Sequence, residues 1–253
     1  VVVEPFRYEA HRTTHSRVTM VVDRDDTGRL LSAMLQSKKS KLRQSRGFCV
    51  PKDSENGLVN MPEVVAVLQR HLPADAVLTN GAGNFATWLH RFHKLPGFDS
   101  GQRHQLAPTN GSMGYGVPAG VAAAIATGRP VFTIAGDGDF LMNGQELATA
   151  SAEGVKTVVL LLNNGMYGTI RMHQEREYPG RISGSSLRNP DFCLLAKGYG
   201  YHAERVTETT QFEAAWTRAW AHPGGALIEL IIDPEVITPK LTLQEISAAA
   251  QSR

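Results

Sequence analysis

Cysteine is scarce in this chain of 253 residues, which holds only Cys49 and Cys193. Two cysteines are too few for a disulfide framework or a cysteine-rich metal site, and their scarcity agrees with a reducing compartment. No run of 18 consecutive apolar residues occurs, so no membrane-spanning helix is expected. The first residues lack the charged, apolar and small-residue order of a signal peptide. We therefore expect a soluble cytoplasmic protein, and the absence of an initial Met indicates a processed chain or a piece of a longer one.

Repeats and low-complexity tracts are also absent, and 42% of the residues are hydrophobic against 20% charged. That apolar fraction excludes a disordered or collagen-like chain and suffices for the core of one large domain or two small ones. The net charge is only +2, but residues 1–53 hold 11 Lys and Arg against 6 Asp and Glu. The basic cluster in this segment, between Lys38 and Arg46, has no interleaved aromatic residue. We interpret it as a basic linker and expect no nucleic-acid partner.

The composition changes near residue 54 and predicts two segments. Residues 1–53 are polar, with one strand-like run over 18–22, and are interpreted as a linker or the tail of a preceding domain. Residues 54–253 alternate short apolar runs with helical patterns, which is typical of an α/β fold, a doubly wound parallel sheet with helices on both faces. The last part of this segment is expected to be a C-terminal tail. The predicted strands are 76–79, 131–135, 156–163 and 226–232.

Helix-start signals precede two of the predicted helices. Asn60 stands before Met61 and Pro62, with Glu63 three positions after it. This pattern predicts that the Asn60 side chain caps the helix and that Glu63 is the acid of a capping box. The φ angle of Pro62 suits the first turn of a helix. Asn189 before Pro190 repeats the pattern, so Asn189 is predicted to cap the next helix. Further helices are predicted over 114–126, 144–152 and 211–221.

Polar residues follow two of the predicted strands at the point where each strand ends. One strand is followed by Gly136-Asp137-Gly138-Asp139, and the next ends in Asn163-Asn164-Gly165-Met166. The carboxyl ends of neighbouring parallel strands meet at one edge of the sheet, where ligands bind. A carboxylate, a carboxamide and backbone carbonyls suit Mg²⁺, although a single carboxylate holds it only if a diphosphate supplies further charge. Taken alone, the Asp-Gly pairs are also compatible with a plain turn.

These residues resemble the signature of the thiamine-diphosphate-dependent enzymes. The Gly-Asp-Gly triplet is followed by 25 residues and then by Asn164, which closes an Asn pair. The resemblance implies that the side chains of Asp137 and Asn164 and the backbone carbonyl of Met166 bind Mg²⁺. It covers residues 57–239, the family's diphosphate-binding module, and implies the thiamine-diphosphate-binding fold.

Two glycine-containing segments extend the resemblance. Residues 79–84 resemble the first diphosphate-contacting loop, although a plain strand-to-helix turn is the alternative. Residues 111–114 resemble the segment that cradles the aminopyrimidine, with the Gly111 carbonyl accepting from its amino group and Met113 as the wedge that bends the cofactor. Asp139 departs from the small hydroxyl residue often found at its position, so it is expected to turn away from the diphosphate. The implied cofactor-binding residues are Asn80, Gly81, Gly83, Asn84, Gly111, Ser112, Met113, Gly136, Asp137, Gly138, Asp139, Asn164, Met166, Tyr167, Gly168 and Thr169.

The resemblance implies a thiamine-diphosphate- and Mg²⁺-dependent decarboxylation or carboligation of a 2-oxo acid, by an enzyme similar to acetolactate synthase. A lyase similar to benzoylformate decarboxylase is an alternative, because His173 stands where biosynthetic acetolactate synthases carry a Trp. His173 is also a candidate proton donor. A non-catalytic cofactor-binding subunit is a second alternative. A Rossmann nucleotide-binding module is a remote third one, suggested by Gly81-Ala82-Gly83. Position 86 is Ala, so the third Gly of that motif is missing, and Asp99 is only weakly placed for binding a ribose.

The family's activating glutamate lies on a separate pyrimidine-binding domain, which this sequence does not contain. We therefore expect the chain to be a C-terminal fragment or one subunit of a split enzyme, and to be inactive alone. Its expected partners are the 2-oxo acid, the pyrimidine-binding domain and further copies in a dimer or tetramer.

Overall fold

The computed structural model describes residues 58–94 and 104–252. Within these residues one sheet of six parallel strands is present, in the order β2-β1-β3-β4-β6-β5. This confirms the predicted parallel sheet, and the four predicted strands are found within one residue of their predicted ends. The strands are β1 (Val77–Asn80), β2 (Gln105–Leu106), β3 (Val131–Gly136), β4 (Thr157–Asn163), β5 (His202–Val206) and β6 (Ala226–Ile231).

The sequence patterns missed β2 and β5. The first is only two residues long, and the second is an edge strand in which only two of five residues are buried, the others being polar and at least partly exposed, such as His202 and Glu204. A continuous apolar run marks only strands that are covered on both faces. The central strands β1 and β3 are buried along their whole length, which is why their runs were visible in the sequence.

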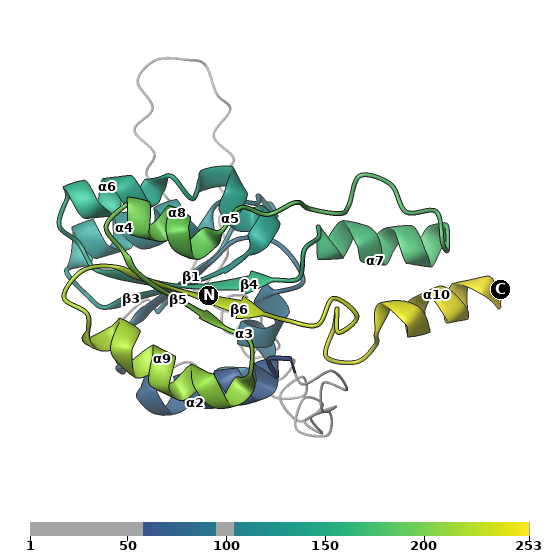
Figure 1. Ribbon diagram of the computed structural model, residues 1–253, viewed down its shortest axis with the longest axis horizontal. Helices are drawn as coiled ribbons and strands as arrows, with labels where there is room; N and C mark the ends of the chain where they lie inside the picture. Colours follow the sequence, from purple (N-terminus) through teal and green to yellow (C-terminus); the bar gives the residue numbers. More distant parts are fainter. Residues whose placement is uncertain (1–57, 95–103, 253) are drawn as a thin grey trace, which may run out of the picture. The chain divides into compact units, whose positions relative to one another are not determined.

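Helices cover both faces of the sheet, so the doubly wound arrangement is confirmed (Figure 1). One face carries α4 (Gly116–Thr127), α5 (Asp137–Asn143), α6 (Glu146–Ala152) and α8 (Phe192–Gly198). The other carries α2 (Met61–His71), α3 (Ala86–Phe92) and α9 (Thr209–Ala221).

A separate hydrophobic core lies between the helices and the sheet on each face. On the face with α9, Trp216 is 1% exposed and meets the ring of Phe132 on β3 edge-on, with centroids 5.6 Å apart. On the face with α5 and α8, Phe140 of α5 meets Phe192 of α8 in the same way at 5.7 Å. Burial of each such side chain contributes about 1.5–3 kcal/mol to stability. Because these contacts hold α5 and α8 on the sheet, they also place the residues at the starts of these helices.

Two predicted helix caps are wrong. Asn60 precedes α2 but makes no side-chain cap; its backbone N–H donates instead to Oγ1 of Thr209 at 2.8 Å. Asn189 is not a cap either, because α8 begins at Phe192 and its N-cap is Asp191, whose Oδ1 accepts from the backbone N–H of Leu194 at 2.9 Å. The side chain of Asn189 is therefore available for other hydrogen bonds.

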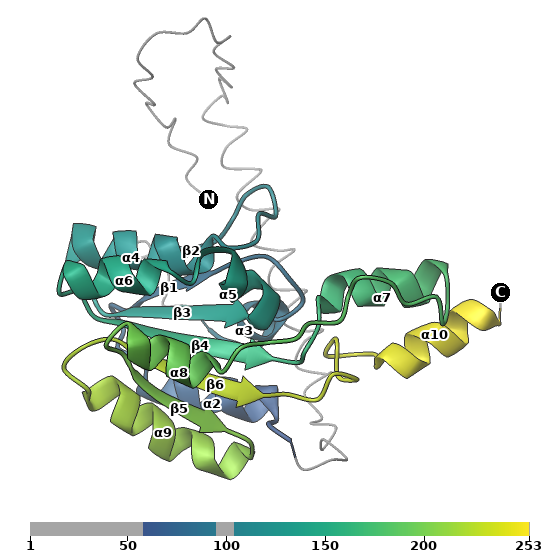
Figure 2. The same cartoon turned by 45° about the horizontal axis from the view of Figure 1, so that its top comes forward.

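Helices α7 (Gly168–Glu177) and α10 (Leu243–Gln251) were not predicted, nor was α5. Figure 2 shows α7 and α10 side by side beyond the carboxyl ends of β4 and β6. Thr242 and Glu245 form a capping box at the start of α10, and this S/T-x-x-E pattern is the signal that identifies the helix in the sequence. The region predicted to be a C-terminal tail thus contains a capped helix.

Some predictions lie outside the described residues. These are the segment 1–53 with its strand-like run and basic cluster, the boundary at residue 54, and Asp99, and they stay predictions. Among the helices that the structure describes, none is long and apolar enough to cross a membrane.

Candidate functional site

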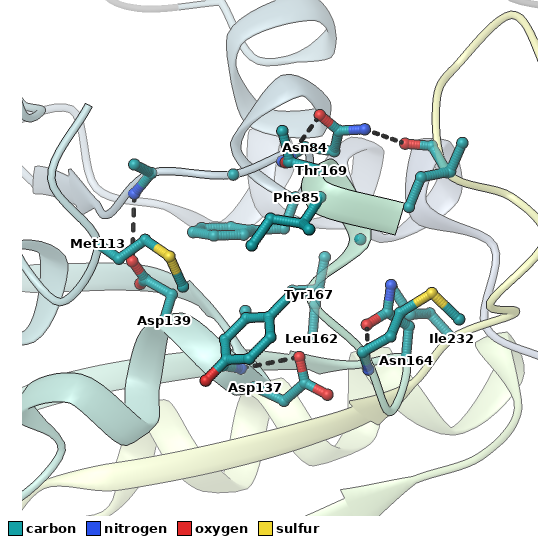
Figure 3. A pocket seen from close by; sticks show the side chains of 18 of the residues that line it. Asn84, Phe85, Met113, Asp137, Asp139, Leu162, Asn164, Tyr167, Thr169 and Ile232 are labelled. Atoms are coloured by element: carbon teal, nitrogen blue, oxygen red, sulfur yellow. Dashed lines mark hydrogen bonds between the residues drawn. The ribbon is translucent and has the colours of Figure 1, made fainter. Parts of the chain in front are cut away.

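A cavity of about 220 Å³ lies at the carboxyl ends of β1, β3 and β4 (Figure 3). Five segments surround it: the loop after β1, the segment before α4, the junction of β3 with α5, the loop between β4 and α7, and the segment after β6. Thirteen of the sixteen predicted cofactor residues line it, so residues far apart in the sequence meet in one place. They are Gly83, Asn84, Gly111, Met113, Gly136, Asp137, Gly138, Asp139, Asn164, Met166, Tyr167, Gly168 and Thr169.

The strand register brings Asp137 next to the loop that follows β4. Gly136 pairs with Leu162 across the two parallel strands, and Asp137 comes directly after the first of them. Asp137 is 2% exposed, and its carboxylate accepts hydrogen bonds from the backbone N–H groups of Gly138 and Gly165, both at 2.9 Å. Burial raises the pKa of Asp137, and hydrogen bonds from Asn189, Gly138 and Gly165 offset part of that rise.

Asn164 and Met166 complete the polar side of the cavity. The Asn164 Oδ1 accepts from the backbone N–H of Met166 at 3.3 Å, and Gly165 between them has a left-handed φ of 69°, which suits glycine. Figure 3 shows Asn164 and Asp137 on the same side of the cavity, with Asn84 and Phe85 opposite. In the described part of the chain no three His, Cys, Asp or Glu side chains gather at a metal site. A cation held between Asp137 and Asn164 would meet one carboxylate and neutral oxygens there, a donor set that fits Mg²⁺ only together with phosphate oxygens.

Asp139 is a second buried acid at the same edge, 2% exposed. Its Oδ1 accepts from the backbone N–H groups of Gly114 at 2.9 Å and Ala82 at 3.1 Å, while its Oδ2 is buried with no hydrogen-bond partner. Burial raises the pKa of Asp139 to about 6, with the two hydrogen bonds lowering it in part. One oxygen faces the loop backbone while Asp139 also lines the cavity, so its orientation relative to a diphosphate stays a prediction.

Three predicted residues do not line the cavity. Asn80 is buried behind the first loop, where its Oδ1 accepts from Nε2 of Gln105 at 3.0 Å. Gly81 lies against Asp139, because a Cβ atom there would overlap the carboxylate. Ser112 is exposed and its hydroxyl donates to Oδ1 of Asn110 at 2.9 Å. These residues support or flank the loops and do not face the cavity.

The loop after β1 is tied to the start of α7. The backbone N–H of Asn84 donates to Oγ1 of Thr169 at 2.9 Å, and the Thr169 hydroxyl lies 3.0 Å from Oδ1 of Asn84 (Figure 3). Two of the predicted contact segments therefore form one wall. Met113, from the segment before α4, is half-buried and projects into the cavity near Asp139.

An apolar wall was missed by the sequence patterns. Phe85, which was not predicted, occupies the space beside Gly136, where a Cβ atom would lie 2.7 Å from its ring. The predicted residue Tyr167 occupies the space beside Gly138 in the same way. These glycines thus make room for aromatic rings. The other unpredicted lining residues are Ala82, Trp88, Leu162, Ile170, Ile232, Val236 and Ile237. Those after β6 are there because β6 is the neighbour of β4, which no local pattern reveals.

The candidate proton donor His173 lies on the exposed surface of α7 and does not line the cavity. The structure therefore does not bring it to the other predicted site residues.

Comparison with known proteins identifies similar sequences. Residues 81–230 match the family described as "Thiamine pyrophosphate enzyme, C-terminal TPP binding domain". The chain is 33% identical over 187 residues to acetolactate synthase isozyme 2 large subunit of Escherichia coli (strain K12), covering 72% of this chain and 33% of that protein. It is 35% identical over 189 residues to acetolactate synthase large subunit of Corynebacterium glutamicum, covering 72% and 29%. It is 31% identical over 202 residues to chloroplastic acetolactate synthase 1 of Zea mays, covering 75% and 31%. The chain thus spans about a third of the length of these relatives.

Proposed function

The chain belongs to the thiamine pyrophosphate enzymes through their C-terminal cofactor-binding domain, and from its site we propose that it binds thiamine diphosphate with one Mg²⁺ for decarboxylation or carboligation of a 2-oxo acid. The reaction proposed is similar to that of an acetolactate synthase. The nucleotide-binding alternative raised by Gly81-Ala82-Gly83 finds no support in the family match.

The observation that carries the proposal is the burial of the Asp137 carboxylate. Its carboxylate is 2% exposed, and its hydrogen-bond donors are backbone or carboxamide N–H groups. Among the described residues no Lys, Arg or His forms an ion pair with it. A buried carboxylate without a cationic partner is costly. A divalent cation between Asp137 and a bound diphosphate would remove that cost.

The residues of the chain divide the work of holding the cofactor. Asp137, Asn164 and the carbonyl of Met166 would hold Mg²⁺, and the Gly111 carbonyl would accept from the aminopyrimidine. The half-buried Met113 would separate and orient the two rings. When bound, thiamine diphosphate supplies the nucleophilic carbon that attacks the carbonyl of the 2-oxo acid. Apolar residues such as Phe85 and Ile237 would keep water from that carbon.

Further groups complete the proposed site. No glutamate lines the cavity within the described ranges, 58–94 and 104–252. We propose that the activating glutamate comes from a pyrimidine-binding domain, on the same polypeptide or on another, and that the protein works as a dimer or tetramer. Reconstitution with such a domain, followed by assay of carbon dioxide release from 2-oxo acids, would separate an enzyme from a non-catalytic cofactor-binding subunit.

Calorimetric titration with thiamine diphosphate at saturating Mg²⁺ tests the proposal. Asp137→Ala removes the carboxylate proposed for the cation and should abolish detectable binding. Asn164→Asp should be milder, because it keeps an oxygen ligand while adding a charge that repels the diphosphate. Asp75→Ala, at an exposed position after α2, is the matched control and should bind as the wild type does. Unchanged affinity in Asp137→Ala would reject the assignment.

A further inference from the structure

Asn189 lies in the segment before α8 and reaches the Asp137 carboxylate. Its Nδ2 donates to Oδ2 of Asp137 at 2.8 Å and to Oδ1 of Asn163 at 2.9 Å. The amide thus joins the end of β4 to the start of α5, the two elements that form the polar side of the cavity. Asn189 itself does not line the cavity, so any effect on a bound cation acts through Asp137.

The chemistry of the partners determines how the two amides are oriented. Glu229 on β6 is 1% exposed and is paired with Nε of Arg205 at 2.7 Å. A carboxylate only accepts hydrogen bonds, so Asn163 presents its Nδ2 to Oε1 of Glu229, at 2.8 Å. The Asn163 oxygen then faces the other way, toward Asn189.

The orientation of Asn189 follows by the same rule. The two groups within its reach, the Asp137 carboxylate and the Asn163 carbonyl oxygen, are both acceptors, so Asn189 must present its NH₂ group to them. The Asn163 oxygen also accepts from the backbone N–H of Gly165 at 3.1 Å. Rotating any one of these side chains would break hydrogen bonds to the next, so the set from Glu229 to Asp137 has a single arrangement.

We propose that Asn189 is a positioning residue for the magnesium site, holding the Asp137 carboxylate in the one orientation that suits Mg²⁺, with Glu229 and Asn163 fixing Asn189 in turn. This inference rests on the proposed function. Mg²⁺ demands near-ideal octahedral geometry, whereas Ca²⁺ accepts irregular sites. Carboxylate ligands are normally held by hydrogen bonds, and loss of such a partner weakens metal affinity by about 10- to 100-fold.

Another residue of this segment has a purely structural role. Asp191, two positions after Asn189, caps α8 and pairs with Arg205, and among the described residues it makes no hydrogen bond to Asp137. Asp191→Ala is therefore the matched control, because it disturbs the same segment without removing the hydrogen bond to the carboxylate.

The test compares Mg²⁺ and Ca²⁺ binding by calorimetry, at saturating thiamine diphosphate, in the full chain. Asn189→Ala should weaken Mg²⁺ binding about 10- to 100-fold and Ca²⁺ binding distinctly less. Asn189→Asp has nearly the same shape but no N–H donor, so it should weaken Mg²⁺ binding as well, although its added charge alone would strengthen it. Asp191→Ala should lower the unfolding midpoint and leave both affinities within about twofold of wild type, as expected for loss of a helix cap.

Unchanged Mg²⁺ affinity in both Asn189 variants would overturn the inference, as would equal losses for the two cations. Should Asn189→Ala not fold, the shape-conserving Asn189→Asp carries the comparison. A wild-type protein that binds neither cation with thiamine diphosphate would contradict the proposed function. If the wild type binds Mg²⁺ and the Asn189 variants bind it with the same affinity, only the role of Asn189 is contradicted.

Discussion

Gly81 and Asp139 compete for one space, since a Cβ atom on Gly81 would overlap both oxygens of the Asp139 carboxylate. Asp139 is held in that space by the backbone N–H groups of Ala82 and Gly114. The carboxylate thereby connects the loop after β1, the segment before α4 and the start of α5. Gly81 belongs to the site because it makes room for Asp139, although it does not line the cavity.

This relationship predicts how the two positions respond to mutation. Gly81→Ala should lower the free energy of unfolding by about 1–3 kcal/mol, because the added methyl group overpacks against the carboxylate. In an Asp139→Ala background the same change should cost clearly less, since the overlapping atoms are gone. Urea denaturation of the four proteins gives the coupling energy. Additive effects would show that the overlap is relieved elsewhere.

Asp139→Asn should tighten the binding of thiamine diphosphate about 3- to 10-fold at pH 8. The variant keeps an oxygen to accept from Gly114 and Ala82 but removes a negative charge from the cavity, which is worth on the order of 1 kcal/mol. Asp139→Ala, which loses both hydrogen bonds, is the comparison and should lower stability. Calorimetric dissociation constants decide the matter, and weaker binding by Asp139→Asn would mean that the carboxylate assists the cofactor.

Met113→Ala should lower turnover per folded site by one to three orders of magnitude, about 1.4 kcal/mol for each factor of ten. The reason is loss of cofactor geometry, because Met113 projects into the cavity. Met113 is only half-buried. The free energy of unfolding of the Met113→Ala protein should therefore fall by less than the roughly 2–5 kcal/mol that replacing a fully buried methionine by alanine costs. Met113→Leu preserves volume and should be tolerated. A destabilised but fully active Met113→Ala protein would identify the side chain as core filling.

Cys193 should be inert to alkylation at pH 8. Burial and the negative charge of Glu229, whose Oε2 lies 3.6 Å from Sγ, raise the pKa of the thiol from 9.0 to about 11. In a Cys49→Ser background, iodoacetamide should therefore label folded protein about 100-fold more slowly than unfolded protein.

The same shift makes stability depend on pH. The folded state keeps the thiol protonated where the unfolded state has lost its proton, so this contribution is present below pH 9 and lost as the pH rises toward about 11. Cys193→Ala should lack that decline in urea denaturation. In the iodoacetamide experiment, labelling of Cys193 at equal rates in folded and unfolded protein would contradict the raised pKa, because it would show that the thiol is accessible and ionised.

The sequence predicted the elements whose signals are local. The runs over β1, β3, β4 and β6 are continuous and apolar because those strands are covered on both faces. The polar residues after β3 and β4 converge as predicted, since parallel neighbours end at the same edge. The family resemblance rested on these residues and is confirmed by the match over residues 81–230.

Only the tertiary structure revealed the contacts of Asn189. An Asn before a Pro carries the local signature of a helix start, yet the helix begins two residues later and Asp191 caps it. The Asn189 amide instead binds Asp137, 52 positions earlier in the chain. Likewise, the residues after β6 join the cavity wall because crossover connections place β6 beside β4. Capping and periodicity depend on neighbours within a few residues, whereas these contacts depend on how distant segments pack, and so no local pattern contains them.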